Sequence, residues 1–273
     1  MPAMSVSPEE VARFDALAAS WWDPNGPMRA LHRMNPARVQ WIVERVGSGV
    51  AATTTASAVM AGRHPWWQRP TTDGRDTPGH DGRGGGLGDG GGMRLLDIGC
   101  GAGVAAEALA RRGFNVLGLD AAGEAIAAAR THAEGRGLLL AYRAGTAEDL
   151  AAEGMRFPVI TALEVIEHVP DPVAFLGTLR ELLTPGGQLF LSTLNRTPRS
   201  FLAAKVAAEY LLRWLPVGTH NWRQFITPAE LAAMLRDLGF RVADVAGLAA
   251  DPLTGQWRVV RDTGVNYLLA ASV

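Results

Sequence analysis

The hydrophobic pattern between residues 94 and 193 alternates between two periods. Short apolar runs of strand length are separated by longer segments whose apolar residues recur every three or four positions. These segments predict strands at 94–98, 115–119, 138–142, 157–162 and 188–193, and helices at 103–112, 123–136, 147–152 and 172–183. Because such alternation is typical of a parallel sheet with helices on both faces, it predicts an α/β fold.

The C-terminal part of the chain continues this pattern. Thr227 and Glu230 have the capping-box spacing that opens a helix, and Gly239 marks its end. The apolar face of this helix is formed by Leu231, Met234, Leu235 and Leu238. Two further strands, 240–247 and 265–271, complete the expected sheet of seven strands.

The N-terminal part predicts two helices joined by an aromatic break. Ser7 has the position of an N-cap and Glu10 that of its capping-box partner, so a helix is expected to begin at Pro8. A second helix has Val39, Ile42, Val43 and Val46 on one face. Trp21 and Trp22 lie between the helices, and two adjacent side chains cannot share one helix face. Either one packs while the other lines a site, or both pack.

Periodicity disappears between residues 48 and 92. This segment contains ten glycines between Gly74 and Gly92, and no strand–turn–helix pattern surrounds them. Such a composition buries too little apolar surface to offset the entropy of ordering the backbone. We therefore predict a disordered insertion, 48–92, between N-terminal helices in 1–47 and a core domain in 93–273.

A glycine-rich turn follows the first strand of the core. Gly99, Gly101 and Gly103 lie between that strand and the next helix, where bare backbone N–H groups face a ligand. The turn also satisfies the dinucleotide-binding pattern, which is a weak signal by itself. Asp97 at the strand end would repel a pyrophosphate but would attract an ammonium group, and Asp120 at the end of the second strand suits a ribose diol. Together they resemble the motifs of class I methyltransferases that bind S-adenosylmethionine (SAM), and a dinucleotide site is the alternative.

Composition and charge narrow the class of protein. The formal net charge is −1, so no overall basic field favours nucleic acid. The single cysteine excludes an intrachain disulfide and fits a reducing compartment. The sequence shows neither a signal-peptide pattern at its N-terminus nor an uncharged apolar run long enough to span a bilayer. We expect a cytoplasmic protein.

An apolar insertion, 196–220, separates the fifth strand from the capped C-terminal helix. Residues 201–215 predict one helix, whose narrow polar stripe contains Lys205, Glu209 and Arg213. Such a helix either packs over the substrate site or lies on a membrane surface. The excess of basic residues over 196–213 favours an anionic lipid face, and both roles are compatible.

The segment after the fourth strand contains the strongest candidates for chemistry. If it is helical, Glu164, Glu167 and His168 share one face and form a plausible divalent-metal site. Alternatively, His168 alone is a general base, because its pKa near neutrality suits proton removal from a phenol. In a third interpretation Glu164 contacts the cofactor and His168 only supports the turn.

Several motifs in one order resemble those of the ubiquinone biosynthesis O-methyltransferase family. They are HRMNPAR at 32–38, EVIEHVPDP at 164–172, STLNR at 192–196, AEY at 208–210, GTH at 218–220 and VNY at 265–267. The resemblance covers nearly the whole chain except 48–92. It implies a Rossmann-like class I methyltransferase fold in which the last strand is antiparallel and helices cover both faces. It also implies SAM-dependent methylation of two ring hydroxyls of polyprenyl-phenol intermediates, namely 2-polyprenyl-6-hydroxyphenol and 3-demethylubiquinol.

The resemblance also assigns residues and partners. Arg38, Gly99, Asp120 and Leu163 would contact SAM, in addition to Asp97 and Gly101 of the glycine turn. Arg38 would pair with the methionine carboxylate, which explains N-terminal helices that fold over the cofactor site. Relatives imply peripheral contact with anionic lipid through 196–220, at the inner face of the cell membrane, and a divalent metal such as Mg²⁺ at Glu164, Glu167 and His168. The alternatives are a methyltransferase of another quinone or phenolic metabolite, and a non-catalytic member of a quinone-synthesis assembly.

Overall fold

The computed structural model describes residues 7–46, 92–202, 222–251 and 254–273. The predicted disordered insertion, 48–92, lies outside the described residues except for Gly92. The predicted helix over 201–215 lies outside them except for Phe201 and Leu202. Neither prediction is therefore tested by the structure.

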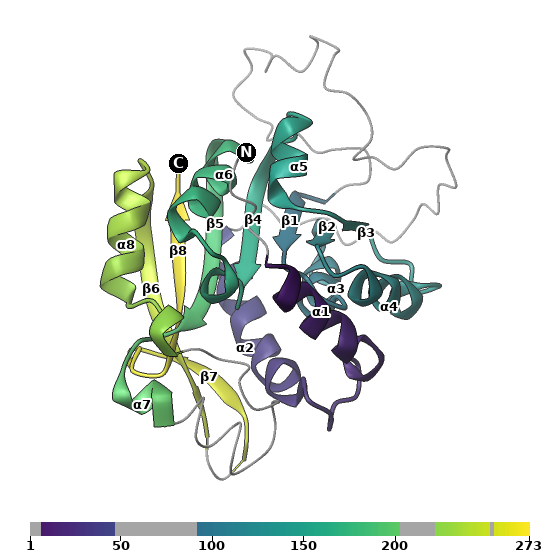
Figure 1. Cartoon of the computed structure of the whole chain (residues 1–273), viewed down its shortest axis with the longest axis horizontal. Helices are drawn as coiled ribbons and strands as arrows, with labels where there is room; N and C mark the ends of the chain where they lie inside the picture. Colours follow the sequence, from purple (N-terminus) through teal and green to yellow (C-terminus); the bar gives the residue numbers. More distant parts are fainter. Residues whose placement is uncertain (1–6, 47–91, 203–221, 252–253) are drawn as a thin grey trace.

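The described strands form one eight-stranded sheet in the order β3-β2-β1-β4-β5-β8-β6-β7 (Figure 1). The strands are β1 Arg94–Ile98, β2 Asn115–Asp120, β3 Leu140–Ala144, β4 Phe157–Leu163, β5 Leu183–Leu194, β6 Arg241–Ala250, β7 Trp257–Val260 and β8 Asn266–Ser272. Neighbours from β3 to β5 pair in parallel, and β8 pairs antiparallel with β5 and β6. The predicted α/β class and the antiparallel last strand are confirmed.

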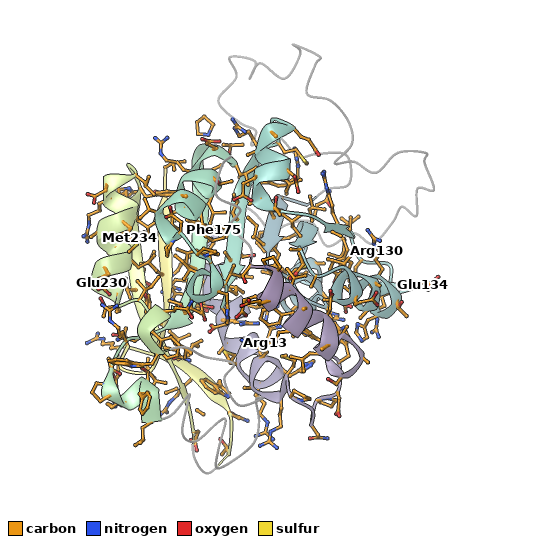
Figure 2. All side chains as sticks on the ribbon, viewed as in Figure 1. Arg13, Arg130, Glu134, Phe175, Glu230 and Met234 are labelled. Carbon is orange, nitrogen blue, oxygen red and sulfur yellow. The ribbon has the colours of Figure 1, made fainter. Side chains whose placement is uncertain are left out.

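Helices cover both faces of this sheet. They are α1 Pro8–Leu17, α2 Arg29–Val46, α3 Val104–Ala110, α4 Gly123–Ala133, α5 Ala147–Ala152, α6 Pro172–Glu181, α7 Pro198–Ser200 and α8 Pro228–Asp237. Apolar side chains of α2, α3 and α4 pack on one face, and those of α5, α6 and α8 pack on the other. Phe175 of α6 shows this packing, because it points from its helix into the core and is buried (Figure 2).

The sheet has one strand more than the sequence predicted. Within the described ranges, the additional strand β7 pairs with the last four residues of β6. Strand β6 continues to Ala250, beyond the end predicted at residue 247. Helix α2 packs beside β7, and Trp257 joins the apolar cluster around that helix. The strand depends on these distant contacts, since its four residues contain a charged Arg258 and give no clear alternation of their own.

The N-terminal helices lie at one end of the parallel strands. Helix α1 crosses the carboxyl ends of the central strands, while α2 lies beside α3 and β7 (Figure 1). None of the helices within the described ranges combines the length and apolar character that a bilayer span requires. The carboxyl edge covered by α1 is the edge at which open α/β sheets bind their ligands.

Candidate active site

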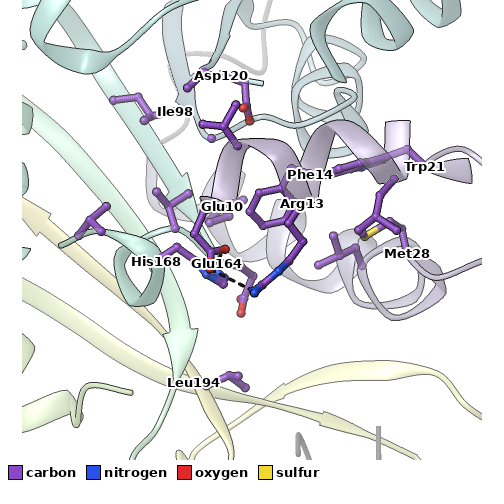
Figure 3. A pocket seen from close by; sticks show the side chains of 18 of the residues that line it. Glu10, Arg13, Phe14, Trp21, Met28, Ile98, Asp120, Glu164, His168 and Leu194 are labelled. Atoms are coloured by element: carbon purple, nitrogen blue, oxygen red, sulfur yellow. Dashed lines mark hydrogen bonds and ion pairs between the residues drawn. The ribbon is translucent and has the colours of Figure 1, made fainter. Parts of the chain in front are cut away.

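A cavity of about 440 Å³ lies between this edge of the sheet and α1 (Figure 3). Four parallel strands, β1, β2, β4 and β5, contribute lining residues from their carboxyl ends, namely Ile98, Asp120, Leu163 and Leu194. The volume is in the range of small-molecule sites, roughly 300–1,000 Å³. Most lining side chains are apolar, and Glu10, Arg13 and Glu164 form a polar group with His168, while Asp120 lies apart from them. The cavity therefore suits a ligand with both a polar and a large apolar part.

The glycine turn forms one side of this site. Gly99, Gly101 and Gly103 have φ angles of 67°, 53° and 90°, a region that glycine adopts at low cost. A Cβ atom at Gly101 would overlap the indole ring of Trp21, and one at Gly103 would overlap the Tyr142 hydroxyl. The glycines are thus required both by the backbone conformation and by the close approach of aromatic side chains.

Asp120 connects the end of β2 to this turn. Its carboxylate accepts hydrogen bonds from the backbone N–H groups of Gly101, at 2.7 Å, and Ala122, at 2.8 Å. Burial raises the pKa of Asp120, although these hydrogen bonds oppose the shift. Asp120 also lines the cavity. A carboxylate held in this way is placed to accept further hydrogen bonds from a diol.

Asp97 and Arg38 lie buried behind the cavity wall, and each has an atom available for a ligand. The Thr161 hydroxyl donates to Asp97 Oδ1 at 2.6 Å, while Oδ2 has no hydrogen-bond partner in the described part of the chain. Burial raises the pKa of Asp97 to about 6. Arg38 donates from Nε to Asn35 Oδ1 at 2.9 Å, and its buried Nη1 likewise lacks a partner among the described residues. One unused acceptor and one unused donor fit the ammonium and carboxylate groups of an amino acid.

Some of the predicted cofactor residues line the cavity, and others are buried close to it. Gly99, Asp120 and Leu163 line the cavity. Arg38 and Asp97 are buried near Glu164, which lines the cavity. The charges of Glu164 and Asp97 oppose the lowering of the pKa of Arg38 by burial, as expected for neighbouring groups. Gly101 is covered by Trp21. The structure thus brings all six into one region, and their contacts with SAM remain predictions.

The helical arrangement assumed for Glu164, Glu167 and His168 is wrong. Glu164 has a φ angle of 57°, which no helical residue adopts, so the chain turns at the end of β4. The helical part of this segment is a short 3-10 helix, Ile166–His168. The Ser192 hydroxyl donates to Glu164 at 2.6 Å, and the Thr193 hydroxyl donates to Glu167 at 2.8 Å. Both carboxylates are therefore used to join the end of β4 to β5.

These three side chains do not form a metal centre in this arrangement. Among the described residues, no group of three or more His, Cys, Asp or Glu side chains is placed to hold a metal ion. Burial and then the charge of Glu164 raise the pKa of Glu167 to about 7. The residues present do not fit the implied metal, and a metal requirement remains an untested prediction.

His168 lines the cavity and contacts α1. Its Nδ1 lies 3.2 Å from Oε2 of Glu10, and its ring meets that of Phe14 edge-on at 5.6 Å between centroids. Burial alone would lower the pKa of His168, but the hydrogen bond to Glu10 and the charges of Glu167, Glu10 and Glu164 outweigh it and raise the pKa. The predicted base therefore lies in the cavity with an acidic partner that the sequence did not suggest.

That partner was assigned a different role from the sequence. Glu10 was expected to complete a capping box with Ser7, yet Ser7 makes no side-chain cap hydrogen bond. The Glu10 carboxylate points into the cavity instead, where Arg13 donates to it at 3.0 Å (Figure 3). The spacing of Glu10, Arg13 and Phe14 on one helical face was the only available signal in the sequence.

Both tryptophans of the aromatic break pack against the core, and one also lines the cavity. Trp21 is 5% exposed and lies over Gly101. Trp22 donates to the backbone oxygen of Ala102 at 2.9 Å and stacks on His132 at 3.4 Å between centroids. The N-terminal segment is thus held against the glycine turn by two adjacent indoles.

The sequence matches known methyltransferases. A family model described as a methyltransferase domain matches residues 85–245. The chain is 43% identical to the ubiquinone biosynthesis O-methyltransferase of Cereibacter sphaeroides over 268 residues, which cover 98% of this chain and 96% of the relative. It is 45% identical to the protein of the same name from Azorhizobium caulinodans over 265 residues, covering 97% and 93% of the two chains.

Solved structures support the fold. One, from a study of the conversion of a disulfide bond into a thioacetal group during echinomycin biosynthesis, has a TM-score of 0.52 and 22% identity, and covers 66% of this chain and 74% of the other. A SAM-dependent methyltransferase from Methanosarcina mazei has a TM-score of 0.50 and 21% identity, and covers 66% and 92%. At this identity the likeness concerns the fold alone.

Proposed function

The chain belongs to the ubiquinone biosynthesis O-methyltransferases, and from this membership and its cavity we propose that it methylates ring hydroxyls of polyprenyl phenols. It is a SAM-dependent O-methyltransferase. The proposed acceptors are 2-polyprenyl-6-hydroxyphenol and 3-demethylubiquinol. The observation that carries the proposal is one cavity that combines His168, the glycine turn and a mainly apolar wall.

The described residues fit SAM. Asp97 Oδ2 would accept from the ammonium group, and Arg38 Nη1 would donate to the carboxylate, because both atoms are buried without partners among the described residues. Asp120 would accept hydrogen bonds from the ribose hydroxyls, while Gly99 and Leu163 would contact the ligand from the cavity wall. When bound, SAM supplies a methyl group on a positively charged sulfur.

His168 acts as the general base in this proposal. A phenol is a weak nucleophile until its proton is removed, and an imidazole in the cavity accepts that proton near neutral pH. The protein contributes mainly by holding the acceptor oxygen against the donor methyl group, since a fixed geometry removes the entropy cost of a bimolecular encounter. The proposed proton transfer uses no metal, because the three side chains that would hold one have other partners.

An apolar substrate also agrees with the surroundings of the cavity. Helix α2 contributes Leu31 and Met34, and the β6–β7 hairpin contributes Ala250 and Trp257. These side chains provide an apolar surface of the kind that a prenyl chain would bury.

Peripheral membrane contact is part of the proposal. Phe201 and Leu202, which are 39% and 64% exposed, immediately precede the undescribed part of the insertion 196–220. Arg199 is exposed beside them and pairs with Asp262 at 2.9 Å. Exposed apolar residues next to a basic one suit the interface of an anionic membrane. Participation in a quinone-synthesis assembly and the absence of a nucleic-acid partner remain predictions.

The test is methyl transfer by the purified protein. Labelled SAM is incubated with a short-chain polyprenyl catechol, with a catechol that has no prenyl chain, and with no acceptor. We expect product with the prenyl substrate and a lower kcat/KM without the chain. SAM binding without transfer to any acceptor would favour the non-catalytic alternative, and a preference for the unprenylated catechol would favour another phenolic substrate.

Membrane contact needs a separate measurement. Flotation with vesicles of anionic phospholipid is compared between the wild-type protein and the Phe201→Ser/Leu202→Ser double variant. We expect the variant to float less while its kcat for a short-chain substrate is unchanged, because Phe201 and Leu202 lie outside the cavity lining. Equal flotation of both proteins would contradict a role for these residues.

A further inference from the structure

Helix α1 brings a carboxylate to the imidazole of His168 from outside the sheet. Glu10 Oε2 lies 3.2 Å from His168 Nδ1, and Arg13 Nη1 lies 3.0 Å from Glu10 Oε1. The three side chains form a chain of charge-assisted contacts at one end of the cavity (Figure 3). Glu10 and His168 are separated by 157 intervening residues, so this contact exists only when α1 covers the edge of the sheet.

The same face of α1 holds the imidazole from a second direction. Phe14 is four residues after Glu10, and its ring is nearly perpendicular to that of His168, at an interplanar angle of 87°. An aromatic edge and a carboxylate together restrict both rotation and tilt of the ring.

The other acidic residues near His168 have different partners. Glu164 accepts from the Ser192 hydroxyl, and Glu167 accepts from the Thr193 hydroxyl. Glu10, by contrast, is directed to the ring nitrogen by its position on α1 and by Arg13. Ser7 makes no side-chain cap hydrogen bond, so the capping box expected from the sequence is not formed.

We propose that Glu10 is a positioning residue that accepts the Nδ1 proton of His168 and thereby fixes the ring as a base at Nε2. This inference rests on the proposed function of His168. With the proton on Nδ1, the lone pair of the neutral ring lies on Nε2. A carboxylate partner also stabilises the imidazolium that forms when the ring accepts a proton.

The reaction is balanced with these groups. The acceptor O–H bond breaks, and its proton moves to His168 Nε2. The phenolate oxygen forms a bond to the methyl carbon as the carbon–sulfur bond breaks, and the sulfur leaves as the neutral thioether of S-adenosylhomocysteine. The imidazolium then releases its proton to water. Glu10 takes up no proton in these steps and keeps the ring in place.

Docking of α1 is therefore coupled to chemistry. The helix lines the cavity through Phe14 and Leu17, and its Glu10 fixes the orientation and tautomer of the His168 ring. When α1 is displaced, the sheet retains the glycine turn and Asp120, but His168 loses its acidic partner. SAM affinity and catalytic rate should consequently respond differently to changes at Glu10.

The test compares Glu10→Ala, Glu10→Gln and the matched control Glu9→Ala. Glu9 is exposed on the same helix. For Glu10→Ala we expect kcat to fall about tenfold or more, with the KM and dissociation constant of SAM changed less than about twofold. Glu10→Gln should recover part of the rate, since its amide oxygen still accepts from Nδ1. Glu9→Ala should behave as wild type.

Two kinetic outcomes overturn the proposal. One is an unchanged kcat in Glu10→Ala. The other is a loss of kcat matched by an equal loss of SAM affinity, which would indicate that Glu10 only supports the fold of α1. If Glu10→Ala does not fold, Glu10→Gln decides: a reduced kcat with unchanged SAM affinity supports the proposal, and a wild-type kcat overturns it.

A measurement without substrate separates this inference from the proposed function. Nitrogen-15 NMR of the histidine rings, at a pH above the pKa of His168, distinguishes the two neutral tautomers, and His168→Gln assigns the signals by their loss. We expect the Nδ1–H tautomer in wild type and Glu9→Ala, and a shift toward Nε2–H in Glu10→Ala. An Nε2–H ring in the wild-type protein overturns the proposal even if methyl transfer occurs. Absence of methyl transfer by wild type would refute only the proposed function.

Discussion

The indole ring of Trp21 lies directly over Gly101, in the middle of the glycine turn. No Cβ atom fits between them, and Gly101 has a φ angle of 53°. Trp21 also contacts Phe14 of α1, with ring centroids 6.0 Å apart. The glycine turn, which is part of the proposed SAM site, is therefore also the surface on which the N-terminal segment docks. A substitution in either one should affect the other.

Gly101→Ala is expected to weaken both cofactor binding and folding. Left-handed backbone costs a non-glycine residue about 1–2 kcal/mol, and the added Cβ displaces Trp21. We expect a lower Tm and a SAM affinity reduced about tenfold or more. The matched control is Gly177→Ala within α6, where a Cβ meets open space and alanine should stabilise by about 0.5–1 kcal/mol. Calorimetry and thermal melts check both, and equal effects of the two changes would refute the prediction.

Trp22→Ala should loosen the N-terminal segment without unfolding the core. The substitution removes the stack on His132 and the hydrogen bond to Ala102. We expect SAM affinity to fall about fivefold, a loss of the order of 1 kcal/mol, and proteolysis near α1 to become faster. Trp222→Ala is the control, because Trp222 donates to Thr197 outside the cavity lining. It should lower the Tm and leave SAM affinity unchanged, whereas a similar loss of affinity in both variants would contradict specific docking.

SAM affinity should depend on pH through Asp97. Burial raises the pKa of this carboxyl to about 6 in the ligand-free protein, and an ammonium group binds its ionised form. Above about pH 6 the affinity should be constant, whereas below it each binding event must release a proton and the affinity should fall by up to about tenfold per pH unit. Asp97→Asn should bind weakly with no such dependence. Calorimetry between about pH 5 and pH 8 measures both, and a flat wild-type profile would exclude this role for Asp97.

Methyl transfer should persist after dialysis against a chelator. In the described arrangement Glu164, Glu167 and His168 are engaged by Ser192, Thr193 and Glu10 respectively. We expect kcat in EDTA to match that with added Mg²⁺, and Glu167→Gln to keep most of the activity because an amide still accepts from Thr193. A loss that Mg²⁺ restores in the wild type but not in Glu167→Gln would instead establish the metal site predicted from the sequence.

Local patterns predicted most of the core correctly. The expected bounds of β1, at 94–98, and of α5, at 147–152, agree with the structure. Both depend on the period of apolar residues and on caps such as Thr146, which accepts from the backbone of Asp149. The strand β7 was missed because its stability comes from α2 and the end of β6, which are distant in sequence.

The residues of the candidate site also divide into those that local patterns predicted and those that depend on distant contacts. The strand–turn–helix pattern by itself placed Gly99 and Asp120 at the ligand edge, because the carboxyl ends of parallel strands meet at one edge of the sheet. Leu163 was assigned by the family resemblance, and all three residues line the cavity. Only the tertiary structure decided the contacts of Glu10. A local pattern assigned this residue to a helix cap, but its carboxylate contacts His168. A capping spacing depends on four neighbouring residues, whereas this contact depends on the docking of a whole helix, and no local period encodes where a helix docks.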